Sequence, residues 1–376
     1  MNEINRLAVY YDNRQVGTMA WYNNASAVFE YTTEWLVDGF SISPISLPLE
    51  KKVFIPKSNN FYGLFGVFAD SLPDGWGRLL VDRLMLRNKL NPHTVGPMQR
   101  LAIVGESGMG ALVYRPEINI RESTNDLSLD EIAAECAKVL KAEYSNELDK
   151  LFVLGGSSGG TRPKILTKVD GEDWIIKFPS THDSPIIGKQ EYDYALCAKN
   201  CGIRMEEVRL LPSETTEGYF GTRRFDRNCQ GSADNKIHMI SSAALLETSH
   251  RIPNLDYNLL MRLTLQLTSS MSECEHLFRL MCFNVFAHNR DDHAKNFSYI
   301  YHEDASSWQL SPAYDLTHSN SIGGEHATTI NGNGKNPSKT EIMEVAKTIG
   351  INTRRANSIV DQVQECVYSH LREYIN

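Results

Sequence analysis

The stretch from Ala287 to Asn296 constrains this chain more than any other part of its sequence. It reads Ala-His-Asn-Arg-Asp-Asp-His-Ala-Lys-Asn and follows directly on the apolar run 277–287. Two carboxylates, two amides, two imidazoles and two cations therefore crowd into ten residues. A solvated surface loop is one interpretation of this pattern. The other is a working site, because carboxylate and amide oxygens are ligands suited to Mg²⁺.

The spacing within this stretch favours the second interpretation. Arg290, Asp291 and Asn296 reproduce the Arg-Asp-x4-Asn spacing of the protein-kinase catalytic loop, with Asn289 where those kinases have histidine. In that chemistry the aspartate orients and deprotonates the attacking hydroxyl, and the asparagine binds Mg²⁺. Asp315 follows beyond a predicted hairpin, where kinases place a second Mg²⁺-binding aspartate. Charged loops also produce such spacings, so the prediction depends on finding the rest of a phosphoryl-transfer site.

A glycine-rich segment upstream is a candidate for that second part. A strand predicted at 151–154 runs into residues 155–164, which contain four glycines and two serines. Glycines let backbone N–H groups approach an anion closely, so the segment is predicted to bind phosphates, although a flexible turn is the alternative. The Walker A spacing is absent. The residues predicted to contact ATP here are Ser157, Ser158, Gly159, Gly160 and Lys164.

Lys177 stands in an otherwise apolar strand predicted at 174–178. The strand follows a hairpin turn signal, Asp170-Gly171. The lysine either faces solvent or pairs with ATP phosphates, and Glu191, early in a helix predicted at 191–201, could orient it. Two further strands are predicted at 205–211 and 219–225. The order of glycine loop, strand lysine, helix glutamate and strands is that of a kinase N-lobe.

Composition limits the remaining classes of protein. A chain of 376 residues with 41% hydrophobic residues suits two or three domains with a sizeable core. The net charge of −8 argues against a broad nucleic-acid surface. Seven cysteines without a C-x-x-C pair are interpreted as reduced thiols without metal spacing. The N-terminus shows no signal peptide and no apolar run approaches the roughly 18 residues of a membrane span, so a cytoplasmic protein is expected.

Three regions are predicted. Residues 1–115 are β-rich, with strands at 7–11, 16–21, 27–31 and 41–47 and a helix at 76–90, and are interpreted as a packing or partner-binding domain. Residues 116–235 hold a helix opened by the capping box Ser128-x-x-Glu131 and then the glycine loop and strands. Residues 236–376 turn helical, with helices predicted from apolar periodicity at 257–268 and 273–287 and further helices at 339–350 and 353–374, apart from the predicted hairpin at 297–310.

Together these motifs resemble the HipA-type serine/threonine kinases, the toxins of bacterial toxin–antitoxin modules. The resemblance covers nearly the whole chain. It implies an α+β protein with a kinase-like two-lobed fold, a β-rich N-terminal subdomain and an α-helical C-lobe. The motifs that carry it are Leu72-Pro-Asp-Gly-Trp76, Gly110-Ala-Leu112, Gly155–Lys164, Arg224-Phe-Asp-Arg227, Asn289–Asn296 and Ser311-Pro-x-Tyr-Asp315.

The resemblance also implies roles for single residues. Asp291 would be the catalytic aspartate, and Asn296 and Asp315 would hold Mg²⁺. Lys177 would bind ATP phosphates, together with His293 and Lys295 of the polar loop, whereas His288 and His318 are interpreted as structural. The backbone at Arg223 and Phe225 would lie at the adenine. Ser157 would undergo inhibitory autophosphorylation, and the adjacent Ser158 is a second acceptor in this chain.

The partners implied are a protein substrate, such as an aminoacyl-tRNA synthetase, and a HipB-like helix-turn-helix antitoxin. This acidic chain would then reach DNA only through the antitoxin, and no membrane is involved. Two alternatives stay open. The same site could phosphorylate a small molecule, although a serine in the glycine loop favours a regulated protein kinase. A catalytically idle co-repressor is the other alternative, and the intact Asp291, Asn296 and Asp315 argue against it.

Overall fold

The computed structural model describes residues 4–23, 25–89, 91–118, 127–228, 236–249, 251–320 and 322–375. Cys229 lies outside these residues, as does the extreme N-terminus on which a leader peptide would be recognised. The chain forms two compact units. The N-terminal unit comprises Met1–Gly188, Leu210–Ile240 and Ala244–Glu247, and the C-terminal unit comprises Lys189–Arg209, Ser241–Ala243 and Thr248–Asn376. The three-part division drawn from the sequence stays a prediction.

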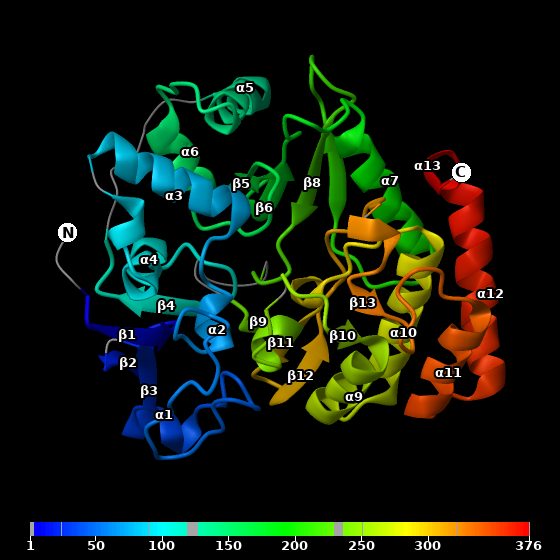
Figure 1. Ribbon diagram of the computed structural model, residues 1–376, viewed down its shortest axis with the longest axis horizontal. Helices are drawn as coiled ribbons and strands as arrows, with labels where there is room; N and C mark the ends of the chain where they lie inside the picture. The colour runs from blue at the N-terminus through cyan, green and yellow to red at the C-terminus, as the bar shows by residue number, and fades with distance from the viewer. Residues whose placement is uncertain are drawn as a thin grey trace. The chain divides into compact units, whose positions relative to one another are not determined.

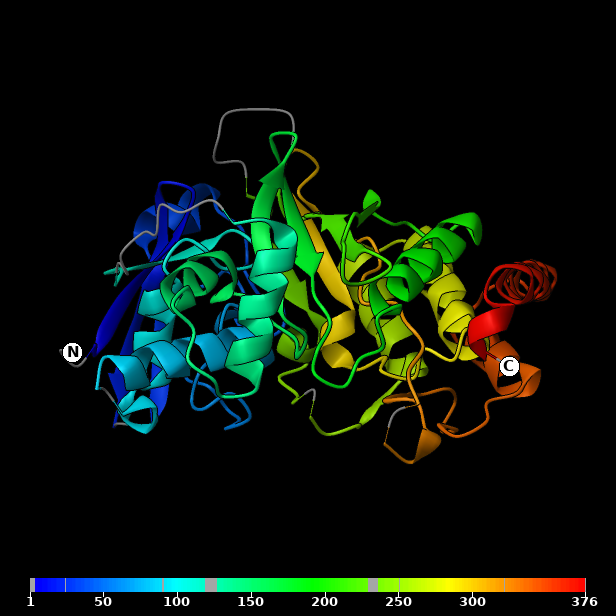
Figure 2. The same ribbon diagram turned by 90° about the horizontal axis from the view of Figure 1, so that it is seen from above.

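The N-terminal unit begins with a four-stranded sheet of order β3-β2-β1-β4, drawn mainly in blue in Figures 1 and 2. Three of the four strands predicted in this region are confirmed. Alternate residues of β1 are buried, as a strand with one face on a core requires. The elements are β1 (Arg6–Tyr11), β2 (Arg14–Tyr22), β3 (Ser26–Tyr31), β4 (Leu112–Arg115), α1 (Thr33–Asp38), α2 (Gly66–Ala69), α3 (Gly75–Arg87), η1 (Pro92–Thr94) and α4 (Pro97–Val104).

The strand predicted at 41–47 is wrong. This segment forms turns, and its ladder pairing is a single bridge between Ser43 and Leu47. Pro44 has no N–H to donate to a ladder. The Ser43 and Ser46 hydroxyls bond each other at 2.8 Å, and the Tyr31 hydroxyl donates to the Leu47 carbonyl at 2.7 Å. Side-chain hydrogen bonds have replaced the strand here.

A second four-stranded sheet, of order β5-β6-β8-β7, follows. Asp170 and Gly171 have φ of 52° and 84°, which confirms the predicted hairpin turn. Ser128 and Glu131 form the predicted capping box. Helices α3, α5 and α6 cover the sheet through a core centred on Trp76, Leu80, Leu151, Ile165 and Ile176. The elements are α5 (Leu129–Leu140), α6 (Leu148–Gly155), β5 (Lys164–Val169), β6 (Glu172–Lys177), β7 (Val208–Leu211) and β8 (Tyr219–Arg223).

The strand predicted at 151–154 is also wrong, because this segment lies within helix α6. A short apolar run does not distinguish a strand from a buried helix. The buried residues are Leu148, Leu151 and Gly155, at the three- and four-residue spacing of one helical face. The glycine-rich segment therefore starts at the C-terminal end of a helix, where Gly156 donates its N–H to the Phe152 carbonyl at 2.7 Å.

The rest of the chain is mainly helical, and α12 packs against α10 and α11. The predicted helices are confirmed, and α9 spans the range predicted from its periodicity. The elements are α7 (Ile187–Asn200), β9 (Met239–Ser241), α8 (Ser242–Leu245), β10 (Leu255–Asp256), α9 (Tyr257–Thr268), α10 (Met271–Phe286), η2 (Ala294–Asn296), β11 (Ser298–His302), β12 (Ser307–Leu310), η3 (Ile322–Gly324), β13 (Thr328–Thr329), α11 (Lys339–Ile349), α12 (Thr353–His370) and α13 (Arg372–Ile375).

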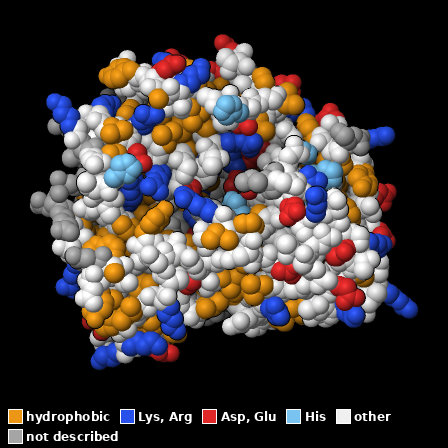
Figure 3. Space-filling view, viewed as in Figure 1, with side chains coloured by type: hydrophobic (Ala, Val, Ile, Leu, Met, Phe, Trp, Pro, Cys, Tyr) orange, Lys and Arg blue, Asp and Glu red, His pale blue; other side chains and the backbone are white. Residues whose placement is uncertain are grey.

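Two surface features bear on the partners expected from the sequence. Over the described residues, no helix combines the length and apolarity needed to cross a membrane. On the face drawn in Figure 3, lysine and arginine side chains are intermixed with acidic and uncharged ones.

Candidate functional site

The polar loop begins where helix α10 ends. Ala287 caps that helix, and its carbonyl accepts a hydrogen bond from the Tyr194 hydroxyl at 2.7 Å. His288 then takes a φ of 54°, a left-handed conformation that turns the chain sharply away from the helix axis. Burial, reinforced by the charge of Arg290, lowers the pKa of His288 and of His318. The two imidazoles are therefore neutral at pH 7, which agrees with a structural role.

Asn289 holds the polar loop in place through hydrogen bonds in the protein interior. Its side chain is buried and donates to the Asn284 side-chain oxygen at 2.9 Å. Asn284 in turn donates to the Tyr257 hydroxyl at 3.0 Å, and that hydroxyl donates to Asp292 at 2.9 Å. The asparagine that stands in place of the kinase histidine is thus the first member of a buried hydrogen-bonded chain.

Asp292 is the centre of this network, and the sequence interpretation gave it no role. Its carboxylate is buried and lies 2.9 Å from His326 Nδ1. It also accepts the backbone N–H of Thr328 at 3.2 Å, while its carbonyl accepts the Thr328 hydroxyl at 2.5 Å. A buried carboxylate without partners would be very costly, so these bonds fix the loop at this residue. The pattern Asp-Asp could have suggested one buried and one exposed carboxylate, but the distant partners could not be foreseen.

Asp291, one residue earlier, is exposed. Its backbone carbonyl accepts a hydrogen bond from the Asn296 side-chain N–H at 2.7 Å, which joins the two ends of the Arg-Asp-x4-Asn motif. His293 caps the intervening 3₁₀ turn, since its Nδ1 accepts the Lys295 N–H at 3.3 Å. The candidate acid and the candidate Mg²⁺-binding amide are therefore held at a set separation by the loop itself.

The hairpin β11–β12 brings Asn296 and Asp315 to the same end of one ladder. Tyr299 pairs with Leu310, and the Ser311 N–H donates to the Ser298 carbonyl at 2.8 Å, so residues before Ser298 and after Ser311 leave the hairpin together. The Tyr314 hydroxyl then donates to the Lys295 carbonyl at 2.5 Å. The backbone segments that carry Asn296 and Asp315 are therefore linked at the open end of the hairpin, away from its turn.

Asp315 itself has a φ of 54°. A non-glycine residue in the left-handed region is uncommon and is often kept at functional sites, where the surroundings fix it. Its neighbour Leu316 is buried and Ala313 donates its N–H to the Arg204 carbonyl at 2.8 Å, so the backbone on both sides is held. These contacts fix the backbone at Asp315 and therefore the direction in which its side chain points.

In the N-terminal unit, the glycine-rich segment packs on the start of helix α3. The Trp76 N–H donates to the Gly160 carbonyl at 2.8 Å, and the Trp76 indole donates to the Lys164 carbonyl at 3.1 Å. The Gly160 N–H donates to Asp74. Gly75 must be glycine, because a Cβ there would collide with the Gly160 carbonyl. The motif Leu72–Trp76, interpreted from the sequence as part of a packing or partner-binding domain, therefore holds the candidate phosphate loop.

Both serines of the loop are buried in this conformation. Ser157 donates its hydroxyl to the Ser107 carbonyl at 2.9 Å, and Ser158 donates to the Gly155 carbonyl at 2.6 Å. Gly159 and Gly160 follow, and Gly160 has a φ of 80° that favours glycine. The serine hydroxyls point into the protein, so a phosphate on either would not fit without movement of the loop.

Lys164 and Lys177 lie directly opposite each other on strands β5 and β6. Directly opposed side chains share one face of a sheet, and two like charges there are unfavourable unless an anion balances them. The Lys177 ammonium also lies 5.5 Å from the centre of the Phe220 ring. Glu191 is buried in the C-terminal unit, and its predicted pairing with Lys177 stays a prediction.

Arg223 ends strand β8 and pairs with Glu172 at 3.1 Å, and Phe225 follows two residues later and is half-buried. The next acid, Asp226, is buried and forms ion pairs with Arg224 and Arg227 at 2.8 and 3.0 Å. It also accepts the Gly110 N–H at 2.6 Å. The Arg-Phe-Asp-Arg motif is therefore a structural clamp on the turn at 108–110, which the sequence did not indicate.

Comparison with solved structures identifies this architecture. A chain of the Shewanella oneidensis MR-1 toxin–antitoxin complex of HipA, HipB and operator DNA superposes with a TM-score of 0.73 at 18% identity, covering 98% of this chain and 90% of that one. The chain has the HipA kinase-like fold, as the sequence predicted.

Sequence comparison agrees with this fold. Residues 156–371 match the HipA-like C-terminal domain, and residues 7–115 match the HipA N-terminal domain. The chain belongs to the HipA family. The putative kinase Y4dM of Sinorhizobium fredii is similar to it, at 27% identity over 159 residues. That match spans 39% of this chain and 37% of the relative, so little more than a third of the relative is covered.

Proposed function

We propose that this chain is an ATP- and Mg²⁺-dependent serine/threonine protein kinase and the toxin of a HipBA-like module. The observation that carries the proposal is the polar loop, in which buried Asp292 and Asn289 fix the backbone while Asp291 stays exposed. An ordinary solvent-exposed loop would not need a network of buried, hydrogen-bonded polar side chains to fix its backbone. Asp291 is then the group that orients the acceptor hydroxyl and takes its proton.

The side chains of Asn296 and Asp315 suit Mg²⁺, which prefers oxygen ligands and is usually held by one or two carboxylates together with substrate phosphates. The metal would neutralise charge that develops on the transferred phosphoryl group. In the N-terminal unit, Lys164 and Lys177 supply paired positive charge for the phosphates. The Ser158 and Gly160 N–H groups would join them on exchanging their bonds to the Gly155 carbonyl and to Asp74 for bonds to phosphate. His293 and Lys295 are proposed to contact ATP from the polar loop, and Arg223 and Phe225 to contact the adenine through their backbone.

Replacement of Asp315 with asparagine is expected to weaken binding of the metal–nucleotide complex by at least about tenfold, because the site loses one of its carboxylate charges. Titration calorimetry with ATP in the presence of Mg²⁺ measures the effect. Asp304→Asn, in the exposed turn of the same hairpin, is the matched control and should bind as the wild type does. Equal affinity in the Asp315 variant would show that this carboxylate does not serve the metal.

Ser157 and Ser158 are proposed as sites of inhibitory autophosphorylation, with Ser157 the better acceptor. A phosphate carries about −1.5 to −2 charges at neutral pH. Neither hydroxyl has room for it, since both are buried and bonded to backbone carbonyls. The modified loop must leave its place against Asp74 and Trp76, and the backbone N–H groups leave with it.

Incubation with Mg²⁺ and ATP is therefore expected to add phosphate within residues 155–161 and to open this segment to limited proteolysis. Ser157→Ala alone leaves Ser158 as a substitute acceptor, whereas the double alanine variant should stay active and resist cleavage. Peptide mass spectrometry and a cleavage time course measure both results, with the exposed Ser306→Ala as control. Phosphate found only elsewhere, or full activity in protein phosphorylated on this pair, would contradict the mechanism.

The partner proposed is a HipB-like helix-turn-helix antitoxin, in keeping with the HipA–HipB–DNA composition of the matched complex. With a net charge of −8, this chain would approach DNA through that partner. The substrate proposed is a protein of the translation machinery, such as an aminoacyl-tRNA synthetase.

Phosphoproteomics after induced expression tests this assignment. The wild type should arrest growth and raise phosphorylation of one or a few translation proteins, and co-expression of a helix-turn-helix protein encoded beside it should reverse the arrest. The Asp291→Ala variant is the control. Growth arrest that persists in this variant would contradict the proposed kinase toxin, and consumption of ATP without any phosphoprotein would favour a small-molecule kinase instead.

A further inference from the structure

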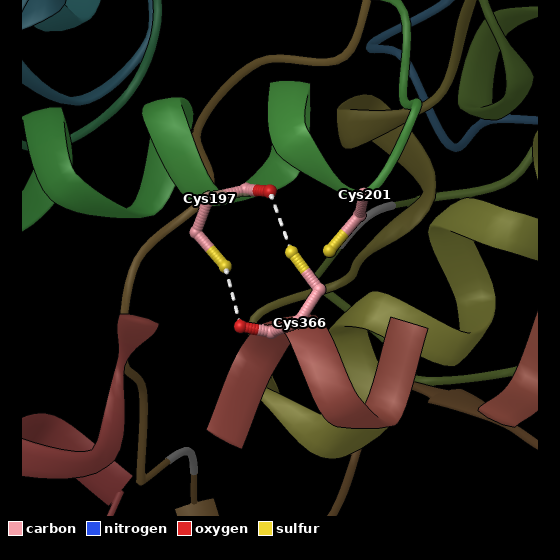
Figure 4. A group of neighbouring side chains, drawn as sticks. All are labelled: Cys197, Cys201 and Cys366. Carbon is pink, nitrogen blue, oxygen red and sulfur yellow. Dashed lines mark hydrogen bonds between the residues drawn. The ribbon is translucent and has the colours of Figure 1, made fainter. Parts of the chain in front are cut away.

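Three cysteines converge between helices α7 and α12 of the C-terminal unit. Cys197 lies in the last turn of α7, Cys201 follows directly after its end, and Cys366 faces them from α12, as Figure 4 shows. Their three sulfur atoms all lie within 4.8 Å of one another. Cys197 and Cys366 are 169 positions apart in the chain, so the cluster is a product of the fold. The C-x3-C spacing of Cys197 and Cys201 is the one local signal of the cluster in the sequence, because side chains four residues apart lie on one face of a helix.

The geometry of the cluster suits a tetrahedral metal. Zinc–thiolate bonds of about 2.3 Å place the sulfurs of a tetrahedral site about 3.8 Å apart. The observed spacing needs only a small inward movement to reach this value. Two of the thiols make only weak hydrogen bonds that a metal would replace, since Cys197 and Cys366 each donate to the other's carbonyl at 3.8 and 3.9 Å. Both carbonyls keep another donor if the thiols turn away, because the Cys197 carbonyl also accepts the Cys201 N–H at 2.8 Å and the Cys366 carbonyl also accepts the Ser369 hydroxyl at 2.9 Å.

His370 is a candidate for the fourth ligand. It lies one turn beyond Cys366 on α12, and its Nδ1 lies 2.8 Å from the Cys366 carbonyl, which can only accept, so Nδ1 carries the proton. Nε2, 3.4 Å from the side-chain amide of Asn200, is then the nitrogen that can bind a metal once the ring turns toward the three sulfurs. A metal-bound histidine usually bonds through its second nitrogen to a group that orients the ring, and the Cys366 carbonyl is such a group. Two i,i+4 pairs, C-x3-C and C-x3-H, thus face each other across the helix pair.

We propose that Cys197, Cys201, Cys366 and His370 form a zinc site that links helix α12 to the C-terminal end of α7. Thiolate and imidazole ligands select a soft or borderline cation, and a four-ligand Cys3His set is typical of a closed, structural zinc site. On binding, each thiol releases its proton and the imidazole coordinates in its neutral form, so three protons leave for every metal ion. Cys197 and Cys201 are almost fully buried, which also fits a structural role.

The first measurement is the metal content of the full-length protein purified without chelators. Elemental analysis should find close to one zinc per chain. Replacing zinc with Co²⁺ should produce the thiolate-to-cobalt charge-transfer band and the strong visible absorption of tetrahedral cobalt. Chelation should lower the melting temperature, because a ligand bound only to the folded state stabilises it in proportion to its saturation.

Variants separate this site from a simple cluster of core thiols. Cys201→Ser and Cys366→Ser should lose zinc and cobalt binding, and their melting temperatures should no longer respond to chelation. Cys274→Ser replaces another buried cysteine of the same unit and should keep both. His370→Gln should bind cobalt more weakly and with an altered visible spectrum.

Three results would overturn the proposal. The first is wild-type protein that neither contains zinc nor gives the cobalt charge-transfer band. The second is metal binding that survives Cys201→Ser and Cys366→Ser. The third is a disulfide within the cluster, which mass spectrometry under non-reducing conditions would detect. An unchanged cobalt spectrum in His370→Gln would remove that residue from the ligand set.

Discussion

Replacement of Asp291 with alanine is expected to reduce phosphoryl transfer by about 10²–10⁴-fold while leaving the protein folded. The carboxylate is exposed, so its removal opens no cavity in the core. Other residues hold the backbone of the loop, because the Asn296 side chain bonds the Asp291 backbone carbonyl, which the alanine variant keeps. The variant therefore loses the proposed base and keeps the loop conformation.

The rate is measured as phosphate transferred per chain under saturating Mg²⁺ and ATP, with thermal melting as the check on folding. Asp304→Ala, an exposed acid in the turn between β11 and β12, should match the wild type in both assays. A folded Asp291→Ala variant with a rate close to that of the wild type would remove Asp291 from the mechanism.

Replacement of Asp226 with alanine is expected to have the largest effect on stability, lowering the free energy of unfolding by about 3–5 kcal/mol. The carboxylate is fully buried between Arg224 and Arg227. Its removal leaves both guanidinium groups without this counter-charge, and the Arg224 side chain is almost completely buried. The turn at 108–110 loses a bond as well, since Asp226 accepts the Gly110 N–H. Denaturant titration followed by fluorescence measures the change.

The Asp226 carboxylate should also make the stability of the fold depend on pH in acid. Burial opposes ionisation of Asp226, but the charges of Arg224 and Arg227 outweigh it and hold its pKa well below the usual range. Its contribution is therefore present above the unfolded pKa, near 3.9, and is lost as the pH falls from there through the folded pKa. Asp38→Ala breaks an exposed ion pair with Arg14 and should cost no more than about 1 kcal/mol. An Asp226 variant with an unchanged midpoint would contradict the clamp.

The sequence predicted those parts of the fold whose signals are local. The helix at 257–268 has a continuous apolar face, and the hairpin at Asp170-Gly171 has a turn that few other residues can form. The two wrong strand predictions both fall on short segments. Residues 151–154 have no periodicity long enough to separate helix from strand. Residues 41–47 contain a proline, and the hydrogen bonds that replace the strand include one from the distant Tyr31 hydroxyl.

The candidate site shows the same division. The spacing of residues along the sequence was enough to predict Asp291, Asn296 and Asp315 as site residues. Asp292 could not, since its partners Tyr257 and His326 come from distant segments that only the fold brings together. Asp74 and Trp76 are similar, because their contact with the glycine loop depends on helix α3 packing beside it. The cysteine cluster likewise joins two helices from opposite ends of the C-terminal unit.

Transfer of the terminal phosphate of labelled ATP is the measurement that tests the proposed function most directly. Purified wild-type protein should label itself in the presence of Mg²⁺, and labelling should disappear when the metal is chelated or when Asp291 is replaced with alanine. Folded, monodisperse wild-type protein that binds no ATP and transfers no phosphate, either to itself or to proteins of a cell extract, would contradict the account.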